Sequence, residues 1–241
     1  MHTLRPFVTH IGLGDNIIQT GLARTLAERF GPIAFPCYER YEMSVKSFFA
    51  HDPLIEVYTL PHQPNWAWGS PPDIVWDQRI KECGMDPTQA IRAGVYAGRG
   101  LDWDFSSSFY QHAEVPYEDR WNKCPIPAAT ATVAQLPPEF PSKRKIFMHD
   151  DPARGFVIRH LVNRAEVYQP DFSDPNQSIL RYTKLIMAAR EIHVIDSAFF
   201  HLINSFPFVP GKLYLHQYPR WPRSLSFRYP TRLNWIYVPF S

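Results

Sequence analysis

Apolar positions along the chain alternate between two spacings. Residues 16–30 place apolar side chains four positions apart, the spacing of one helix face: Ile18, Leu22, Leu26 and Phe30. Gly31 and Pro32 end this helix. Short apolar runs with the length of buried strands surround it, at 7–11, 33–38, 54–60 and 71–77. Strands that alternate with helices predict a parallel sheet with helices packed on it.

The same alternation returns after a stretch in which the pattern is weak. Residues 98–141 are rich in aromatic and polar side chains, and 137–145 has the composition of a linker. Strand-like and helix-like segments then alternate again, at 145–151, 178–190, 191–197, 198–206 and 211–217. We therefore predict an α/β protein with two Rossmann-like domains, over 1–138 and 139–218, and a tail at 219–241 that packs back on the body.

Composition and charge exclude several classes of protein. The chain has 241 residues, 45% of them apolar, which is enough to bury a core. Its net charge is +2 and its lysines and arginines are scattered, so we predict no nucleic-acid partner. Cys37, Cys83 and Cys124 are far apart, so we expect reduced thiols rather than disulfides or a zinc site. No signal peptide or membrane-length apolar run is visible, so we expect a cytoplasmic protein without a transmembrane segment.

The segment HIGLGDNIIQ, at 10–19, joins the first strand to the first helix. Gly12 and Gly14 match two positions of a dinucleotide-binding loop, but Ile17 stands where the third glycine is needed. Asp15 places a carboxylate where a phosphate would bind, which disfavours a nicotinamide or flavin site. Two interpretations of Asp15 stay open. It is either an N-cap that stabilises the helix by about 1 kcal/mol, or a catalytic carboxylate that accepts a proton from a hydroxyl.

The segment HVIDSAFFHL, at 193–202, has the same strand-to-helix organisation in the second half. The strand ends at Asp196, Ser197 can cap the next helix, and His201 lies one turn further along the same face. The first turn of this helix has no carboxylate, so its N-terminus can receive a pyrophosphate. The alternative for His201 is a buried histidine that only packs.

The segment MHDDPARGF, at 148–156, follows another apolar strand of the second half. Its Arg154 suits a diphosphate, because the planar guanidinium binds oxygen atoms in pairs. The alternative is a charged surface loop.

Two segments resemble those of the ADP-heptose glycosyltransferases and related GT-B enzymes. Residues 12–31 resemble the N-terminal glycine–aspartate segment of that family, and 194–206 resemble its C-terminal donor segment, in the same order. The resemblance implies a GT-B fold, in which two Rossmann-like domains face a central cleft. It also implies an inverting, metal-independent glycosyltransferase, with the acceptor on the first domain and the sugar nucleotide on the second.

The resemblance assigns roles to individual residues. Asp15 matches the aspartate proposed as general base, beside the tight turn of Gly12 and Gly14. The donor segment is matched by Asp196, Ser197, Ala198 and His201, although Ala198 stands where the family usually has glycine. Arg154 takes the place of the cationic residue that neutralises the leaving diphosphate. The other residues of the predicted active-site loops are Asn16, His149, Asp150 and Asp151.

The implied partners are a sugar nucleotide and a glycan acceptor, with no cofactor and no metal ion. We expect UDP or GDP rather than ADP as the nucleotide. Aromatic side chains of the weakly patterned stretch offer stacking faces to the acceptor: Trp103, Tyr110 and Trp121. An aromatic core explains these side chains equally well.

Two other functions stay open at this point. Asp102 and Asp104 have the DxD spacing of metal-dependent GT-A transferases, in which carboxylates hold Mn²⁺ or Mg²⁺ against the diphosphate. In the second alternative, the protein binds a nucleotide or a glycan without catalysing a reaction and has kept only the fold.

Overall fold

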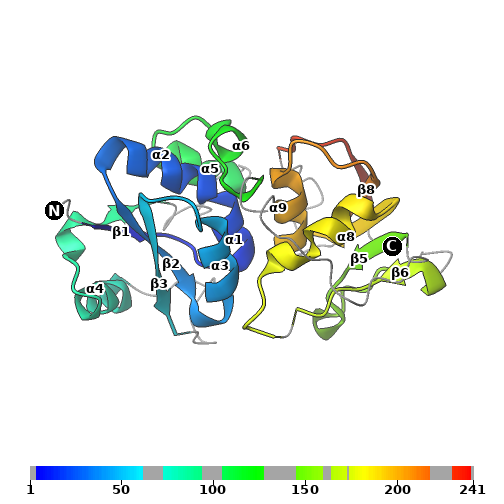
Figure 1. Ribbon diagram of the computed structural model, residues 1–241, viewed down its shortest axis with the longest axis horizontal. Helices are drawn as coiled ribbons and strands as arrows, with labels where there is room; N and C mark the ends of the chain where they lie inside the picture. The colour runs from blue at the N-terminus through cyan, green and yellow to red at the C-terminus, as the bar shows by residue number, and fades with distance from the viewer. Residues whose placement is uncertain are drawn as a thin grey trace.

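The computed structural model describes residues 4–61, 73–93, 105–127, 145–159, 164–172, 174–217 and 230–239. They form two α/β halves, each built around one parallel sheet (Figure 1). The prediction of two parallel-sheet domains is therefore confirmed. The predicted boundary between them, at 138, lies outside the described residues.

The N-terminal half has a four-stranded parallel sheet in the order β3-β2-β1-β4. Its strands are β1 (Arg5–Val8), β2 (Ile33–Tyr38), β3 (Ile55–Leu60) and β4 (Ile91–Arg92). Its helices are α1 (Leu13–Ile18), α2 (Thr20–Phe30), α3 (Glu42–Phe48), α4 (Asp73–Glu82), α5 (Phe105–His112) and α6 (Asp119–Asn122), with short 3-10 helices η1 (Glu39–Tyr41) and η3 (Pro87–Gln89). Every residue of β2 is buried, as expected for a strand covered on both faces.

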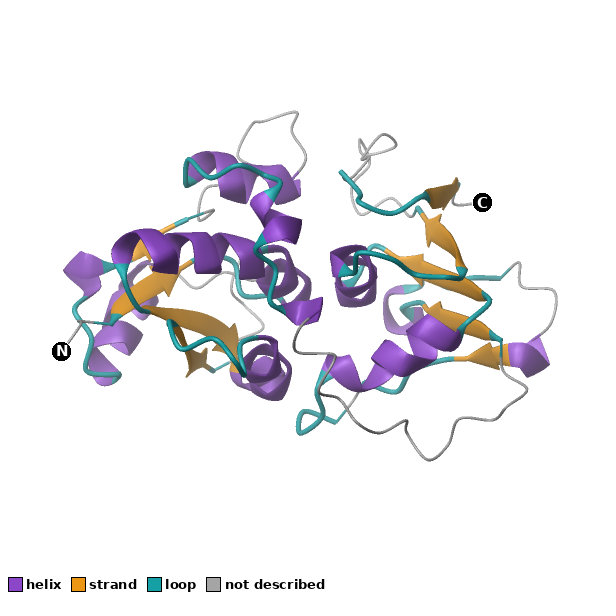
Figure 2. Ribbon diagram, turned by 45° about the horizontal axis from the view of Figure 1, so that its top comes forward, coloured by secondary structure: helices purple, strands orange, loops and turns teal. Residues whose placement is uncertain are grey.

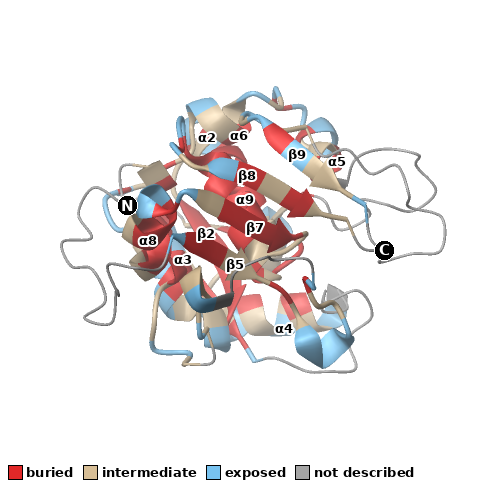
Figure 3. Ribbon diagram, turned by 90° about the vertical axis from the view of Figure 1, so that its right-hand side faces the viewer, coloured by how far each residue is buried: buried red, intermediate tan, exposed pale blue. Residues whose placement is uncertain are grey.

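The C-terminal half has a five-stranded parallel sheet in the order β6-β5-β7-β8-β9. Its strands are β5 (Ile146–His149), β6 (Val167–Tyr168), β7 (Glu191–Ile195), β8 (Lys212–His216) and β9 (Trp235–Val238). Its helices are α8 (Thr183–Ala188) and α9 (Ala198–Ser205), with 3-10 helices η4 (Pro152–Arg154), η5 (Arg164–Glu166) and η6 (Ile179–Tyr182). Buried residues run along β7 and the neighbouring α9 (Figure 3).

Strand β9 comes from the tail predicted at 219–241. It pairs with β8 in parallel, with Trp235 opposite Leu213. The Trp235 ring lies 4.9 Å from that of Phe200 in α9. This part of the tail thus extends the C-terminal sheet and packs on the body, as predicted.

Two predicted elements differ from the structure. The strand predicted at 71–77 is wrong, because α4 forms there and buries Trp76 and Ile80, four positions apart, on one helix face. The helix predicted from residue 16 begins at Leu13 and is interrupted at Gln19. The Gln19 side-chain amide donates to the carbonyl oxygens of His10 (3.1 Å) and Asp15 (3.0 Å), so it holds the loop before α1 and the helix together.

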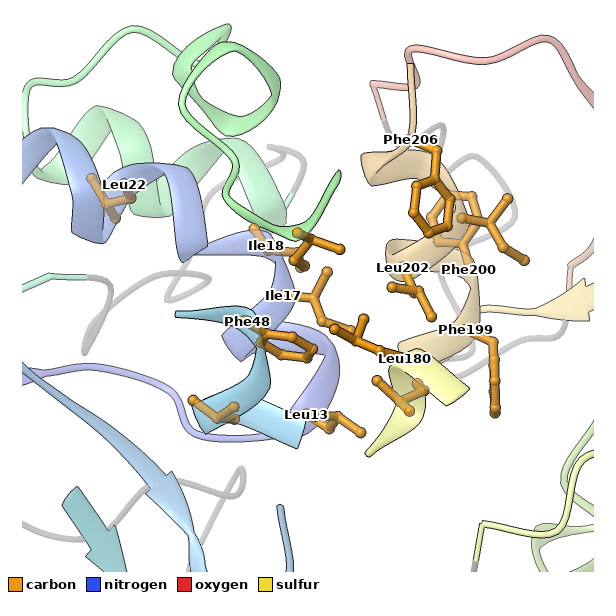
Figure 4. Packing of buried hydrophobic residues seen from close by; sticks show 14 of the residues in the cluster. Leu13, Ile17, Ile18, Leu22, Phe48, Leu180, Phe199, Phe200, Leu202 and Phe206 are labelled. Carbon is orange, nitrogen blue, oxygen red and sulfur yellow. The ribbon is translucent and has the colours of Figure 1, made fainter. Parts of the chain in front are cut away.

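The two halves meet where α1 packs against α9, in the middle of Figure 2. Close to this junction, α1 presents Ile17 and α9 presents Leu202 (Figure 4). One cluster of buried apolar side chains contains residues of both halves. The Ile179 backbone N–H also donates to Ser44 Oγ across the junction (3.0 Å). The halves are therefore joined by packed side chains as well as by the chain itself.

All three cysteines are free thiols. Burial raises the pKa of Cys37 to about 12, so this thiol stays protonated at neutral pH. Among the described residues, no helix combines the length and apolar character needed to cross a bilayer.

Candidate active site

Asp15 lies in the first turn of α1, the helix that follows the carboxyl end of β1 after a short loop. The helix begins at Leu13 with Gly12 as its N-cap, so the interpretation of Asp15 as the N-cap is wrong. The Asp15 carboxylate lies over Gly12, because a Cβ atom at that glycine would be only 2.7 Å from Asp15 Oδ2. The side chain is partly exposed. Asp15 thus presents a carboxylate at the end of the sheet where open α/β folds place their sites.

Gly14 and Asn16 position this turn in different ways. A Cβ atom on Gly14 would lie 3.1 Å from Cδ2 of His201 and 3.8 Å from Cα of Ala198. At Gly14, α1 of the first half therefore approaches α9 of the second closely. Asn16 is fully buried, and its amide donates to the carbonyl oxygen of Pro36 (3.0 Å), which fixes α1 to β2.

On the other side of the junction, β7 ends before Asp196 and α9 begins. Ser197 is the N-cap of α9, but its hydroxyl makes no cap bond and lies 3.2 Å from Nδ1 of His149 instead. The His149 ring packs on Phe199, with 4.6 Å between ring centroids. Burial lowers the pKa of His149 to about 4, so this imidazole is neutral at pH 7. It can exchange hydrogen bonds with a ligand but does not offer it a charge.

The loop after β5 holds Arg154 in place through its two aspartates. Asp150 is buried and accepts from the Ile158 N–H (3.1 Å) and the Gln169 amide (2.6 Å), which shapes the loop. Asp151 accepts from Nε of Arg154 (2.5 Å), and the Arg154 side chain is 52% exposed. A guanidinium anchored on one side and open to solvent on the other is suited to an anionic ligand.

His201 lies between the halves. Its Nδ1 is 3.1 Å from Nη2 of Arg120 in α6, and its Nε2 is 3.5 Å from Oδ1 of Asp196. Burial lowers the pKa of His201, and the Arg120 charge lowers it further, while Asp196 and Asp15 raise it. The net shift is downward, which favours a neutral ring.

Tyr41 connects the two sides electrostatically. Burial raises its pKa, the charges of Arg40 and Arg154 lower it, and that of Asp15 raises it. Asp15 of the first half and Arg154 of the second therefore lie close enough to the same phenol for both charges to act on it. The guanidinium of Arg40 is 4.6 Å above the Tyr41 ring. The sequence singled out neither Tyr41 nor Arg40, although both directly follow β2, the strand beside β1.

Comparison with solved structures identifies the fold that carries these residues. A glycosyl transferase of family 9 from Veillonella parvula matches with a TM-score of 0.53 and 10% sequence identity, over 99% of this chain and 88% of that one. The chain has the GT-B fold. E. coli heptosyltransferase WaaC, solved with ADP-2-deoxy-2-fluoro heptose, matches with a TM-score of 0.47 and 10% identity, over 98% of this chain and 93% of that one. No family model and no curated protein matches the sequence.

The three aromatic residues predicted to stack on an acceptor lie in different surroundings. Tyr110 is fully buried, accepts from the Leu22 N–H (3.1 Å) and donates to the Ile18 carbonyl (2.7 Å), so its ring belongs to the core rather than to an acceptor site. Trp121 packs edge-on against Tyr117, with 5.3 Å between centroids. Trp103 lies outside the described residues.

The two carboxylates of the GT-A alternative, Asp102 and Asp104, also lie outside the described residues. Within the part of the chain that the structure describes, no three His, Cys, Asp or Glu side chains are grouped so as to hold a metal ion.

Proposed function

We propose that this protein is an inverting glycosyltransferase that moves a sugar from a nucleoside-diphosphate sugar to a hydroxyl of a glycan acceptor without a bound metal ion. The observation that carries the proposal is that unlike groups follow strands of the two halves, which pack on each other through α1 and α9. A carboxylate, Asp15, follows β1, while an exposed guanidinium, Arg154, and the start of α9 follow β5 and β7. Such a pair suits a reaction in which a proton leaves one oxygen as negative charge grows on another.

In the proposed reaction, Asp15 accepts the proton of the acceptor hydroxyl. The hydroxyl oxygen forms a bond to the anomeric carbon from the face opposite the diphosphate. The bond between that carbon and the diphosphate oxygen breaks, and the nucleoside diphosphate leaves with the electron pair. Arg154 and the backbone N–H groups at the start of α9 stabilise its charge. Neutral His201 contributes hydrogen bonding rather than charge.

We further propose a UDP- or GDP-sugar as donor, and the cytoplasm, where sugar nucleotides are available, as the site of the reaction. Tyr41 and Arg40 are proposed to border the acceptor beside Asp15. Asp196 and Ser197 are proposed to contact the donor, with His149 supporting the Ser197 hydroxyl.

The first experiment is thermal unfolding with UDP, GDP, ADP or CMP, each with Mn²⁺ and again with EDTA. A ligand that binds only the folded state stabilises it by about 2.7 kcal/mol at a hundredfold excess over Kd. We expect one nucleoside diphosphate to stabilise the protein equally well in EDTA. Stabilisation only with Mn²⁺ would favour Asp102 and Asp104, and none at all would contradict the proposal.

A matched pair of variants then tests the donor side. Arg154→Ala is expected to weaken nucleoside-diphosphate binding about tenfold or more, the effect of one lost charged hydrogen bond. Arg190→Ala removes another exposed arginine, next to the amino end of β7, and is expected to leave binding unchanged. Equal affinities in the two variants would remove Arg154 from the site.

A further inference from the structure

Arg120 is a buried cation with neutral partners. It is only 3% exposed, and its guanidinium donates to Ser106 Oγ (3.3 Å), to the Tyr117 hydroxyl and to His201 Nδ1 (3.1 Å). Among the described residues, no carboxylate lies within ion-pair distance of it. A buried charge without an opposite charge is costly, and among the described residues hydrogen bonds and the rings of Tyr117 and Trp121 stabilise it. Such a residue requires an explanation beyond packing.

The chemistry of arginine fixes the direction of its bond to His201. A guanidinium has donors and no acceptor, so Nδ1 of His201 must accept and cannot carry a proton. In the neutral imidazole the proton is then on Nε2. Nε2 is the atom that lies 3.5 Å from Oδ1 of Asp196, so the N–H is directed toward that carboxylate.

The ring is also held from the side. Gly14 lies close against the edge of the imidazole, since an added Cβ atom would lie 3.1 Å from Cδ2. Arg120 and Gly14 belong to the N-terminal half, and His201 and Asp196 to the C-terminal half. The contacts therefore run from one half to the loop at the end of β7 in the other.

We propose that Arg120 is a positioning residue that holds the His201 ring as its Nε2–H tautomer and, through it, orients the Asp196 carboxylate at the donor side of the site. Only the last link, from Asp196 to a nucleotide, rests on the proposed function. The state of the His201 ring is independent of it.

The test is NMR of the protein labelled with ¹⁵N in its histidine rings, with His201→Gln assigning the His201 signals. We expect wild-type His201 at pH 7 to be neutral, with Nδ1 unprotonated and the proton on Nε2. A proton on Nδ1 of wild-type His201 would overturn the proposal, and this result needs no variant of Arg120.

Arg120→Met removes the donor while keeping an apolar side chain of similar length. We expect His201 then to populate both tautomers and to titrate at higher pH, because it loses the Arg120 charge and keeps Asp196 and Asp15 nearby. Lys123→Met is the matched control, since Lys123 lies on the surface close to Arg120 and pairs with Glu28. A His201 ring unchanged in Arg120→Met would also overturn the proposal.

The link to the site is tested by affinity. We use whichever of UDP, GDP and ADP stabilises the wild-type protein most. We expect its Kd to rise about tenfold in Arg120→Met and to stay unchanged in Lys123→Met. Unchanged affinity in Arg120→Met would contradict the link from Asp196 to the donor. If none of the three binds the wild type, the proposed function fails, while the ring spectrum still decides the role of Arg120.

Discussion

His149 shows how one residue of the candidate site affects both the site and the stability. Its ring is held between the Ser197 hydroxyl and the Phe199 ring, where burial opposes the addition of a proton. Two further histidines, His193 and His201, also have their pKa lowered by burial. All three are therefore expected to be neutral in the folded protein at pH 7.

This predicts a loss of stability in mild acid. The pKa of His149 is about 4 when folded and 6.5 in the reference state. The unfolded chain therefore takes up a proton below pH 6.5 while the folded protein does not. This contribution to the free energy of unfolding is complete above pH 6.5 and is lost as the pH falls. At pH 5, protonation of His149 in the unfolded chain lowers the free energy of unfolding by about 2 kcal/mol.

Urea unfolding at pH 7.5 and pH 5.0 measures this effect. His149→Gln should reduce the difference in unfolding free energy between the two pH values. His51→Gln, which replaces an exposed histidine, should leave that difference as it is. A pH dependence equal in the wild type and in His149→Gln would contradict the assignment.

Sequence chemistry identified the residues that follow the strands of the site. Asp196 comes directly after a strand, Asp15 lies in the first turn of the helix that follows β1, and Arg154 lies in a charged loop after β5, so their types and places were readable. The role of Arg120 could not be predicted from the sequence. It depends on the contact with His201, which is 81 positions away along the chain and comes close only in the fold. Tyr41 was missed for a similar reason, because the charges of Asp15 and Arg154 act on its phenol only in the folded chain.

At the scale of elements, the packing of α1 against α9 depends on a glycine in the first turn of α1. Gly14 lies against the His201 ring and the Ala198 backbone, so the two helices approach closely there. Gly12 precedes the same helix, but the atom nearest to its missing Cβ is the carboxylate tip of Asp15, which can move. An added methyl group should therefore change the free energy of unfolding by different amounts at Gly12 and at Gly14.

Gly14→Ala is predicted to lower the free energy of unfolding by about 1–3 kcal/mol, the usual effect of overpacking. Gly12→Ala should change the free energy of unfolding less, since its backbone (φ −61°, ψ 148°) suits alanine, and should instead displace the Asp15 carboxylate. Urea denaturation of both variants at pH 7.5 makes the comparison. Equal stability of the two variants would show that the α1–α9 contact tolerates a larger residue.

The predicted elements were reliable where apolar residues were numerous. Strand β2 lies at the predicted residues, and the helix predicted over 16–30 contains α2. The window at 71–77 has only three consecutive apolar residues, at 74–76, which are too few to distinguish a strand from the first turns of α4. The hydrogen bonds that the Gln19 side chain makes at the break, to the carbonyls of His10 and Asp15, could not be predicted either, because they form only in the folded loop.

At the scale of the molecule, the two halves share one apolar cluster. A domain that buries a face against its neighbour loses that burial when the neighbour unfolds. We therefore predict a single cooperative unfolding transition for both halves.

Ile17→Ala tests this, because Ile17 lies in α1 at the junction and is only 1% exposed (Figure 4). The variant should lower the free energy of unfolding by about 2–5 kcal/mol. Hydrogen exchange should show that the opening free energy of the amides in β2 and of those in β7 falls by the same amount. Ile74→Ala, at a position 77% exposed, should change stability by less than about 0.5 kcal/mol. A decrease confined to β2 would show that the halves unfold separately.

The two-domain organisation was predictable because strand and helix patterns occur twice along the chain. The way the halves join was not, since Ile17 and Leu202 look like ordinary core residues of their own helices. Only the folded chain shows that these side chains face one another across the junction.

The most direct test of the account is sugar transfer itself, with Asp15→Asn compared with the wild type. The assay follows release of the nucleoside diphosphate from the bound sugar nucleotide, in EDTA, with a panel of glycan acceptors. The wild type should transfer the sugar. Asp15→Asn should bind the nucleotide with unchanged affinity and transfer about 10²–10⁴-fold more slowly, the usual effect of losing a general base. Transfer by Asp15→Asn at the wild-type rate would contradict the account.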